Sequence, residues 1–154
     1  VPCGDFTWMN EFLKKKKIRY MGGDIVKKLI NDNNKVYPEF NFSLFDLTKD
    51  QLSESFDVLH VRDCLFHFSF KDIKKTLKNI MNYKVKYILI TSHQGILLKN
   101  YDIKTGKFRY LDLNKKPFFF PKPILRLKDY NLGEFPRYVN VWKKVDLKKT
   151  LEKN

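Results

Sequence analysis

The chain has 154 residues, of which 43% are hydrophobic and 16% aromatic, which is enough for one domain with a single core. No apolar run reaches the roughly 18 residues that a membrane span needs, so we expect no membrane segment. The net charge of +14 suggests a nucleic-acid partner, but only five of the 31 basic residues are Arg, the residue whose planar fork grips phosphates and bases. The lysines are scattered, and the one tight run, Lys14–Lys17, follows a predicted helix. These features favour a solvated surface over a nucleic-acid interface.

The cysteines exclude two classes of stabilising site. Cys3 and Cys64 are the only two in the chain, and they form no CxxC pair. They therefore predict neither a disulfide framework nor a zinc site, and we expect no metal. A reducing, cytoplasmic location follows as the expectation.

Hydrophobic periodicity divides the chain into alternating helices and strands. The clearest segment is an amphipathic helix over 69–84, where Ile73, Leu77 and Ile80 form an apolar stripe and Ser69 is placed to cap the N-terminus. In chain order we predict a helix over 7–13, a strand over 18–21, a helix from 25 that ends at Asn33–Asn34, strands over 40–47 and 56–63, the helix over 69–84, a buried parallel strand over 85–92, an irregular aromatic stretch over 93–123, and antiparallel strands over 124–130 and 137–147.

This order predicts an α/β fold with an open, mostly parallel twisted sheet, flanking helices and a C-terminal antiparallel strand pair. The opening letters, VPCGDF, are typical of the turn after a buried strand, so we expect the first strand to be missing or truncated. No repeat or internal boundary is visible. We therefore predict a single partial domain over 1–154, with a candidate lid or substrate segment over 93–123 and a frayed basic tail over 147–154.

Such sheets bind ligands beyond the carboxyl ends of their strands. Gly4 permits a sharp turn and close approach of a ligand to the backbone. Asp24 ends the next predicted strand, about 20 residues later, where a ribose-binding carboxylate belongs in nucleotide-binding α/β units. An ordinary turn at Gly4 and a helix-capping role for Asp24 are the structural alternatives.

Three further strand ends carry candidate residues. Asp46 could accept from an adenine amino group, with Leu47 as an apolar wall, or it could cap the next turn. Arg62, Asp63 and His67 crowd one strand-to-helix junction, where an Arg–Asp pair could also be purely structural. At the end of the last parallel strand stands a lone histidine, His93, of a kind that is more often structural than catalytic.

The glycine turn, the strand-end Asp, the strand-end Asp-Leu and the motif D-x-x-x-x-R-D-C-L-x-H-F together resemble the class I S-adenosylmethionine-dependent methyltransferases. The resemblance extends from Val1 to about Asp146 and implies a Rossmann-like sheet. Gly4 matches the central glycine of the family's first motif, while Pro2 and Phe6 replace the flanking ones. The acidic residue of that motif would precede Val1.

The resemblance implies S-adenosylmethionine as cofactor. Gly4 and its backbone neighbours would face the methionine part, Asp24 the ribose hydroxyls, and Asp46 with Leu47 the adenine. Arg62 and Asp63 would lie beside the sulfonium. The residues that we expect to contact the cofactor are Pro2, Gly4, Asp5, Asp24, Ile25, Asp46, Leu47 and Arg62.

We predict methyl transfer to a small-molecule or sugar acceptor by O-methylation, because Arg-Asp-Cys-Leu at 62–65 replaces the Asn/Asp-Pro-Pro-aromatic tetrapeptide of nucleobase amino-methylating enzymes. Asp63, His67 and His93 are the expected catalytic residues, since a base near neutral pKa would remove a hydroxyl proton. Asp102 and Arg109 are the expected substrate contacts. The alternatives are an RNA methyltransferase, a non-catalytic cofactor-binding relic and a nicotinamide dehydrogenase, and the absence of GxGxxG speaks against the last. The pattern does not indicate an oligomeric state.

Overall fold

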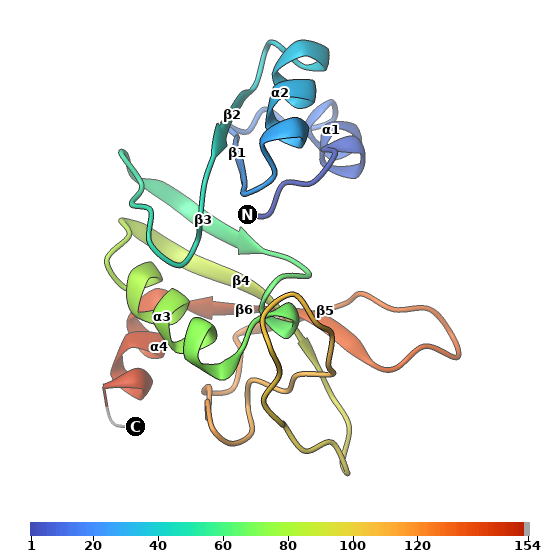
Figure 1. Ribbon diagram of the computed structural model, residues 1–154, viewed down its shortest axis with the longest axis vertical. Coiled ribbons are helices and arrows are strands. Elements are labelled where there is room, and N and C mark those ends of the chain that lie inside the picture. The colour runs from blue at the N-terminus through green and yellow to red at the C-terminus, as the bar shows by residue number, and fades with distance from the viewer. Residues whose placement is uncertain (153–154) are drawn as a thin grey trace. The chain divides into compact units, whose positions relative to one another are not determined.

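The computed structural model describes residues 1–152 and divides the chain into two compact units, residues 1–47 and the residues from 48 onward. Helices are interspersed with strands along the chain (Figure 1), which confirms the predicted α/β class. Within the described residues, no helix is both long and apolar enough to cross a membrane.

The first unit is a pair of parallel strands with two helices. Its elements are α1 (Thr7–Leu13), β1 (Met21–Asp24), α2 (Lys27–Val36) and β2 (Asn41–Leu44), and β1 pairs with β2 in parallel register. Phe6 is fully buried at the centre of the small core. Four aromatic rings surround it, with centroids 4.9–5.0 Å from its own: Tyr20, Tyr37, Phe40 and Phe42. Edge-to-face packing of this kind stabilises a core that is too small for many aliphatic residues.

The glycine pair in β1 lies against two phenylalanines, Phe42 and Phe45, and leaves no room for a side chain. A Cβ atom on Gly22 would lie 2.5 Å from Cδ1 of Phe42, and one on Gly23 would lie 2.9 Å from Cβ of Phe45. The predicted strand over 18–21 is therefore wrong in position, because Gly22 and Gly23 lie inside the strand and do not end it.

The second unit is a four-stranded sheet in the order β3-β4-β6-β5. The strands β3 (Phe56–Val61) and β4 (Val85–His93) pair in parallel, whereas β6 (Arg137–Lys143) runs antiparallel to β4 and to β5 (Leu125–Lys128). The predicted C-terminal antiparallel pair is confirmed. The register places His93 opposite Arg137, which brings two segments 44 positions apart to the same edge of the sheet.

In the described part of the second unit, the helical segments are η1 (Leu65–His67), α3 (Phe70–Ile80) and α4 (Lys144–Leu151), and Figure 1 labels the last two. The short 3-10 turn η1 follows β3 and precedes α3, whose N-terminus is capped by the Ser69 hydroxyl as predicted. The last helix is α4, with Leu147 fully buried. The expectation of a frayed tail from residue 147 is therefore wrong up to residue 151, and residues 153–154 lie outside the described chain.

The long stretch from 94 to 124 contains no assigned helix or strand, as predicted, yet it is firmly packed. The backbone N–H of His93 donates to the carbonyl of Leu111 at 2.7 Å, and the N–H of Leu113 donates to Oγ of Ser92 at 3.0 Å. Leu111 and Leu113 are fully buried. These contacts fit the packed edge that the sequence left open as the alternative to a lid.

Candidate functional site

In the first unit, the turn at Gly4 lies against Asp24, the last residue of β1. Gly4 has a positive φ of 56°, and its N–H donates to Oδ2 of Asp24 at 3.1 Å. The N–H of Val26 donates to Oδ1 of the same carboxylate at 3.0 Å. The Asp24 residue is only 4% exposed. Since a carboxylate offers about four lone-pair positions, two remain for other donors.

The residues around this turn differ in how free they are to meet a ligand. Oδ1 of Asp5 accepts from the N–H of Thr7 at 3.2 Å, so this amide at the start of α1 already has a partner. Ile25 is exposed next to Asp24, as is Pro2 before the turn. A Cβ atom on Gly4 would meet nothing within 4 Å, so there is open space beside the turn.

Asp46 lies two residues beyond the end of β2, at the same end of the parallel strand pair as Asp24, the last residue of β1. The register pairs Asp24 with Leu44, and the N–H of Phe45 donates to the carbonyl of Asp24 at 2.9 Å. Strand spacing of about 4.8 Å and two Cα–Cα steps of about 3.8 Å place the two Asp Cα atoms within about 12 Å. Asp46 is half-buried, whereas Leu47 is buried. The free acceptor positions of Asp24 and the open space at Gly4 fit a ribose with its hydroxyls.

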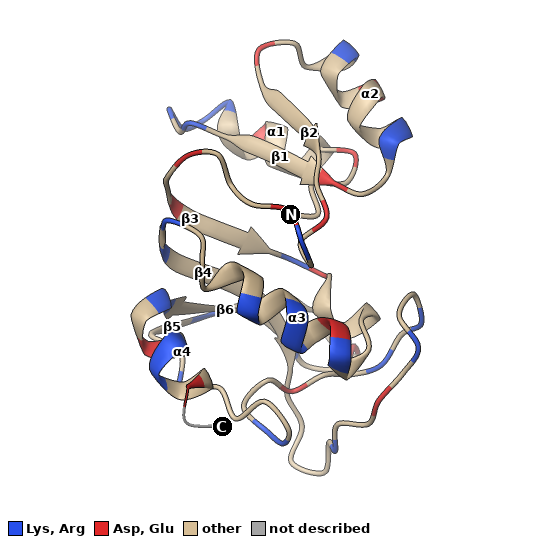
Figure 2. Cartoon of the chain, turned by 60° about the vertical axis from the view of Figure 1, so that its left-hand side comes forward, with Lys and Arg blue, Asp and Glu red and all other residues tan. Residues whose placement is uncertain are grey.

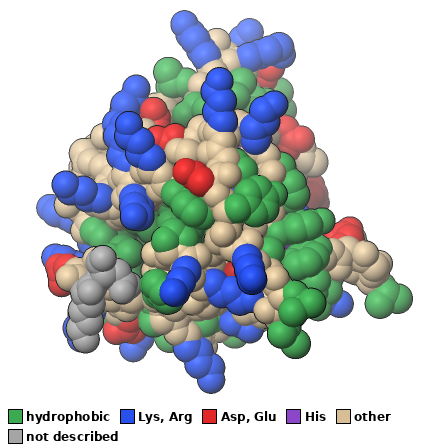
Figure 3. All heavy atoms as spheres, turned by 60° about the horizontal axis from the view of Figure 1, so that its bottom comes forward, with side chains coloured by type: hydrophobic (Ala, Val, Ile, Leu, Met, Phe, Trp, Pro, Cys, Tyr) green, Lys and Arg blue, Asp and Glu red, His purple; other side chains and the backbone are tan. Residues whose placement is uncertain are grey.

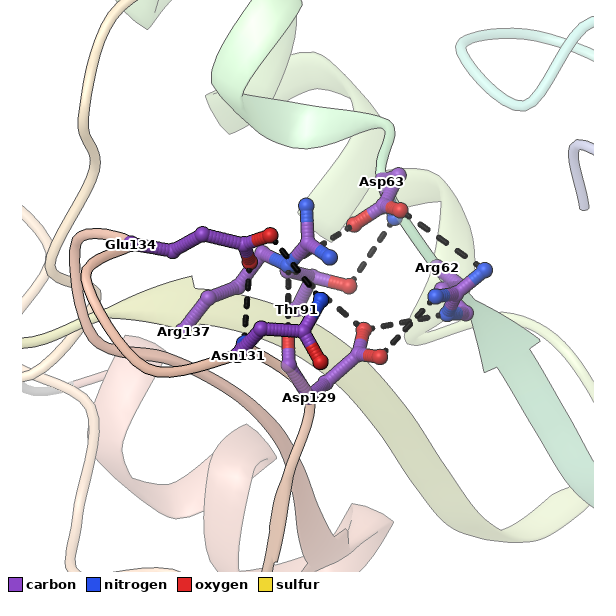
Figure 4. Close-up of polar contacts among 7 residues, drawn as sticks. All are labelled: Arg62, Asp63, Thr91, Asp129, Asn131, Glu134 and Arg137. Atoms are coloured by element: carbon purple, nitrogen blue, oxygen red, sulfur yellow. Dashed lines mark hydrogen bonds and ion pairs between the residues drawn. The ribbon is translucent and has the colours of Figure 1, made fainter.

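In the second unit, four charged side chains form a network at the end of β3 (Figure 4). Arg62 donates to both carboxylate oxygens of Asp129, from Nε at 3.1 Å and from Nη2 at 2.9 Å. Arg137 lies with its Nε 3.6 Å from Oδ2 of Asp129 and 3.9 Å from Oδ1 of Asp63. We call Arg62, Asp63, Asp129 and Arg137 the charge quartet. Its two cations and two anions cancel.

The backbone of Asp63 has an unusual conformation, which a hydrogen bond to Thr91 supports. Its φ is +51°, a conformation that is uncommon for residues other than Gly, Asn and Asp. Its N–H donates to Oγ1 of Thr91 at 2.9 Å, which secures the turn after β3 to β4. The two-point hydrogen bond to Asp129 raises the pKa of Arg62, so this guanidinium stays charged.

The two predicted catalytic histidines are in opposite hydrogen-bonding states. Nδ1 of His67 lies 3.0 Å from the carbonyl oxygen of Lys107, so it carries the proton, and Nε2 of the neutral ring has a free lone pair. Nδ1 of His93 accepts from the N–H of Leu111 at 3.2 Å, so its proton is on Nε2. Burial, followed by the charge of Arg137, lowers the pKa of His93 to about 4.

Both histidines belong to one group of rings, which we call the aromatic cluster. Its members are Phe66, His67, His93, Phe108, Tyr110 and Phe135. Tyr110 and Phe135 are stacked, with centroids 4.1 Å apart and planes at 16°. The sequence reasoning missed Phe135 and Arg137 because only the antiparallel pairing of β6 with β4 brings them beside His93.

The two predicted substrate contacts have structural partners. Arg109 is 1% exposed, donates from Nη1 to the carbonyl of Phe68 at 2.6 Å, and lies 4.9 Å above the ring of Phe70. Oδ1 of Asp102 accepts from the N–H groups of Phe70, at 2.6 Å, and Ile103, at 2.9 Å. Both residues thus anchor the irregular stretch to the start of α3, and their role toward a substrate stays a prediction.

Comparison with known proteins identifies the fold. No protein-family model and no curated protein matches the sequence. The structure is similar to an S-adenosylmethionine-dependent methyltransferase from Clostridium acetobutylicum, with a TM-score of 0.64, 11% identity, and coverage of 92% of this chain and 81% of that one. It is also similar to a TehB-like SAM-dependent methyltransferase from Corynebacterium glutamicum, with a TM-score of 0.62, 19% identity and coverage of 92% and 76%.

The same fold occurs in a protein described as a pericyclic reaction enzyme, with a TM-score of 0.69, 10% identity and coverage of 93% of this chain and 42% of that one. Because one fold supports more than one reaction, the choice among them depends on the residues of the site. The chain has the Rossmann-like fold of the class I S-adenosylmethionine-dependent methyltransferases.

Proposed function

We propose that this chain is an S-adenosylmethionine-dependent methyltransferase that methylates a hydroxyl group of a small-molecule or sugar acceptor. The observation that carries the proposal is the Asp24 carboxylate, which lies at the end of β1 and accepts the N–H of Gly4 from the glycine turn. A glycine turn joined to a strand-end carboxylate is the arrangement that nucleotide-binding α/β units use for a ribose. The shared fold supports the same assignment.

Four residues of the first unit would hold the cofactor. The two free acceptor positions of Asp24 would take the ribose hydroxyls, Gly4 would leave room for the methionine part, and Asp46 would accept from the adenine amino group with exposed Ile25 nearby. When bound, the cofactor supplies an electrophilic methyl group on a sulfonium. The protein must then orient the acceptor, exclude water and remove a proton.

We assign proton removal to His67. Its Nδ1–H is held by the Lys107 carbonyl, so Nε2 offers the lone pair that a general base needs. His93 is less suited to this role, because Leu111 occupies its Nδ1 and its Nε2 carries a proton. The lowered pKa of His93 keeps the ring neutral near pH 7, so its Nε2–H can donate a hydrogen bond but cannot accept a proton. Asp63 and Arg62 would orient the acceptor.

Titration calorimetry with S-adenosylhomocysteine tests the cofactor assignment. We expect the Asp24→Asn variant to bind at least about tenfold more weakly, because a hydrogen bond to a charged group contributes about 1.5–3 kcal/mol. Asp32→Asn, which removes an exposed carboxylate paired with Lys28 on the same helix, is the matched control. Equal affinity of the wild type and Asp24→Asn would refute the proposed site, and no binding by the wild type would refute the methyltransferase assignment.

Methyl transfer itself is tested by incubating the chain with methyl-labelled cofactor and metabolite fractions. Once an acceptor is found, His67→Gln should lower kcat by about 100-fold or more, the usual contribution of a general base. The same substitution at His60, in β3 outside the aromatic cluster, is the control. If His67→Gln keeps the wild-type rate and pH profile, the base is another group.

One observation favours RNA as a second candidate acceptor. Lysines line a groove of about 460 Å³ beside α4 and β4. They are Lys86, Lys143, Lys144 and Lys148. Lys86 is paired with Asp57 at 2.7 Å, however, and Lys144 donates to the Tyr83 carbonyl. In Figure 2 basic residues occur on α2, α3 and α4 and also on several loops, and in Figure 3 they are interleaved with hydrophobic side chains. A steep salt dependence of RNA binding would favour this alternative.

A further inference from the structure

The aromatic cluster presents two rings to solvent, while two of its other members are buried and His67 and Phe135 are half-buried. Phe108 is 52% exposed and Tyr110 is 40% exposed, whereas Phe66 and His93 are buried. The Phe108 and Tyr110 centroids are 5.3 Å apart with planes at 83°, so together they form a corner of two aromatic surfaces. Exposed rings beside a candidate catalytic residue mark a surface for a ligand.

The rings are fixed in place before any ligand binds. Phe135 stacks on Tyr110, and Gly95 makes room for it, since a Cβ atom on Gly95 would lie 2.9 Å from Cζ of Phe135. Phe108 contacts Phe66 and His67, with centroids 5.5 and 5.8 Å away. A ligand that meets rings already held by packing loses less conformational entropy on binding.

The charge quartet beside the cluster has no net charge. Arg137 of the charge quartet is the register partner of His93, and it lies near Asp63. The side chains of Arg62, Asp63 and Arg137 remain about 30% exposed, at 31%, 32% and 29%. They offer both donors and acceptors, and Nε2–H of His93 and the Tyr110 hydroxyl add to them. A neutral ligand rich in hydroxyl groups suits this set better than a carboxylate or phosphate.

We infer that Phe108 and Tyr110 form the acceptor-binding surface and that its ligand is a neutral pyranose ring. One face of such a ring carries C–H bonds, which pack against the electron-rich face of an aromatic ring. Its hydroxyls would exchange hydrogen bonds with Asp63 and Arg137. This inference rests on the proposed function, and it selects the sugar among the acceptors considered there.

The geometry also distinguishes a pyranose from a planar aromatic ligand. The Phe135 ring already covers one face of Tyr110, and Phe108 stands nearly perpendicular to Tyr110. The corner therefore offers single outer faces and no parallel slot between two rings. A planar base or phenol gains most from such a slot, whereas a puckered ring needs only one face and partners at its edge.

Saturation-transfer difference NMR with the full chain tests this inference. The probes are the methyl α-glycosides of D-glucose, D-mannose, D-galactose and L-rhamnose, with catechol and uridine as planar competitors. We expect at least one glycoside to bind, with its ring C–H protons receiving the strongest saturation. Tyr110→Ala and Phe108→Ala should each weaken binding about fivefold, the amount expected for one aromatic contact.

The control variant is Tyr101→Ala, which removes an exposed tyrosine of the same stretch that is not in the cluster. It should bind the glycoside as the wild type does. Tyr110→Leu, which keeps a bulky apolar side chain but removes the ring, tests the same point if Tyr110→Ala unfolds. The inference is overturned if no glycoside binds, if binding survives loss of both rings, or if catechol or uridine binds the cluster in preference to every glycoside.

The result separates this inference from the proposed function. Glycoside binding is measured without cofactor, and cofactor binding is measured with S-adenosylhomocysteine alone. Suppose that S-adenosylhomocysteine binds and that Tyr110→Ala methylates a non-sugar acceptor at the wild-type rate. The sugar-binding surface is then refuted, and the methyltransferase assignment stands. If glycosides bind at Phe108 and Tyr110 but S-adenosylhomocysteine does not bind, the sugar-binding surface stands and the methyltransferase assignment is refuted.

Discussion

Acid should destabilise the second unit through His93. This side chain is 3% exposed, and burial together with Arg137 lowers its pKa from 6.5 to about 4. The unfolded chain therefore binds a proton first as the pH falls. The contribution of His93 to stability is complete above about pH 6.5 and is lost between about pH 6.5 and pH 4. Linkage with these values gives a loss of about 2 kcal/mol between pH 8 and pH 5.

The perturbation that tests this is His93→Asn, because Asn does not titrate and its Oδ1 can accept the N–H of Leu111 in place of Nδ1. Urea unfolding followed by tryptophan fluorescence gives the free energy of unfolding at each pH. In a Trp8→Phe background the reporter is Trp142, which is buried in the second unit and is then the one tryptophan left in the chain.

We expect His93→Asn to be less stable than its parent at pH 8 but to lose about 2 kcal/mol less than the parent on going to pH 5. Burial also lowers the pKa of His60 to about 4, but His60 is present in both proteins, so its effect cancels in the comparison. Equal losses in the two proteins would refute the claim that His93 stays neutral because it is buried.

Three further substitutions test packing, capping and the charge quartet. Gly22→Ala should destabilise the first unit by about 1–3 kcal/mol, because its Cβ would lie 2.5 Å from the Phe42 ring; Trp8 fluorescence in a Trp142→Phe background measures this, and an unchanged urea midpoint would contradict it. Ser69→Ala should lower the free energy of unfolding of the second unit by about 1 kcal/mol, because the Ser69 hydroxyl accepts the third N–H of α3 at 3.1 Å. Ser69→Asp should retain this cap, and equal destabilisation by both substitutions would argue against a capping role. Arg62→Lys should lower the midpoint of thermal unfolding modestly, because Lys cannot repeat the two-point bond to Asp129, and a midpoint equal to the wild type would show that the pair contributes only charge.

The parts of the fold that follow from local pattern were predictable from the sequence. The helix over 70–80 repeats its apolar residues at helical spacing and has its capping residue next to it, so neighbouring residues alone specify it. The strand over 85–93 is a short apolar run of the kind that a buried strand requires. Asp24 and Asp63 were recognised as strand-end residues because each closes a strand pattern, with Gly22–Gly23 or Arg62 between it and the last apolar residue.

The parts that depend on distant contacts were not predictable. Asn33 was expected to end α2, but it is buried, and its Nδ2 donates to the carbonyl of Gly4 at 2.8 Å, so the helix continues to Val36. The buried position of Arg109 within the irregular stretch depends on the carbonyl of Phe68, 41 residues earlier in the chain, and its role toward a substrate stays a prediction. A tautomer is likewise invisible in a sequence, since it depends on which backbone group faces each ring nitrogen.

The stretch that carries the exposed rings alternates in the way that it uses its residues. Phe108 and Tyr110 point to solvent, while Arg109 and Leu111 between and after them are buried. Inward positions hold the backbone, whereas the outward rings pack against Phe66, His67 and Phe135 at the surface. If the outward rings contact the acceptor as we infer, a library randomised at 108 and 110 would alter acceptor selectivity while the buried residues keep the scaffold.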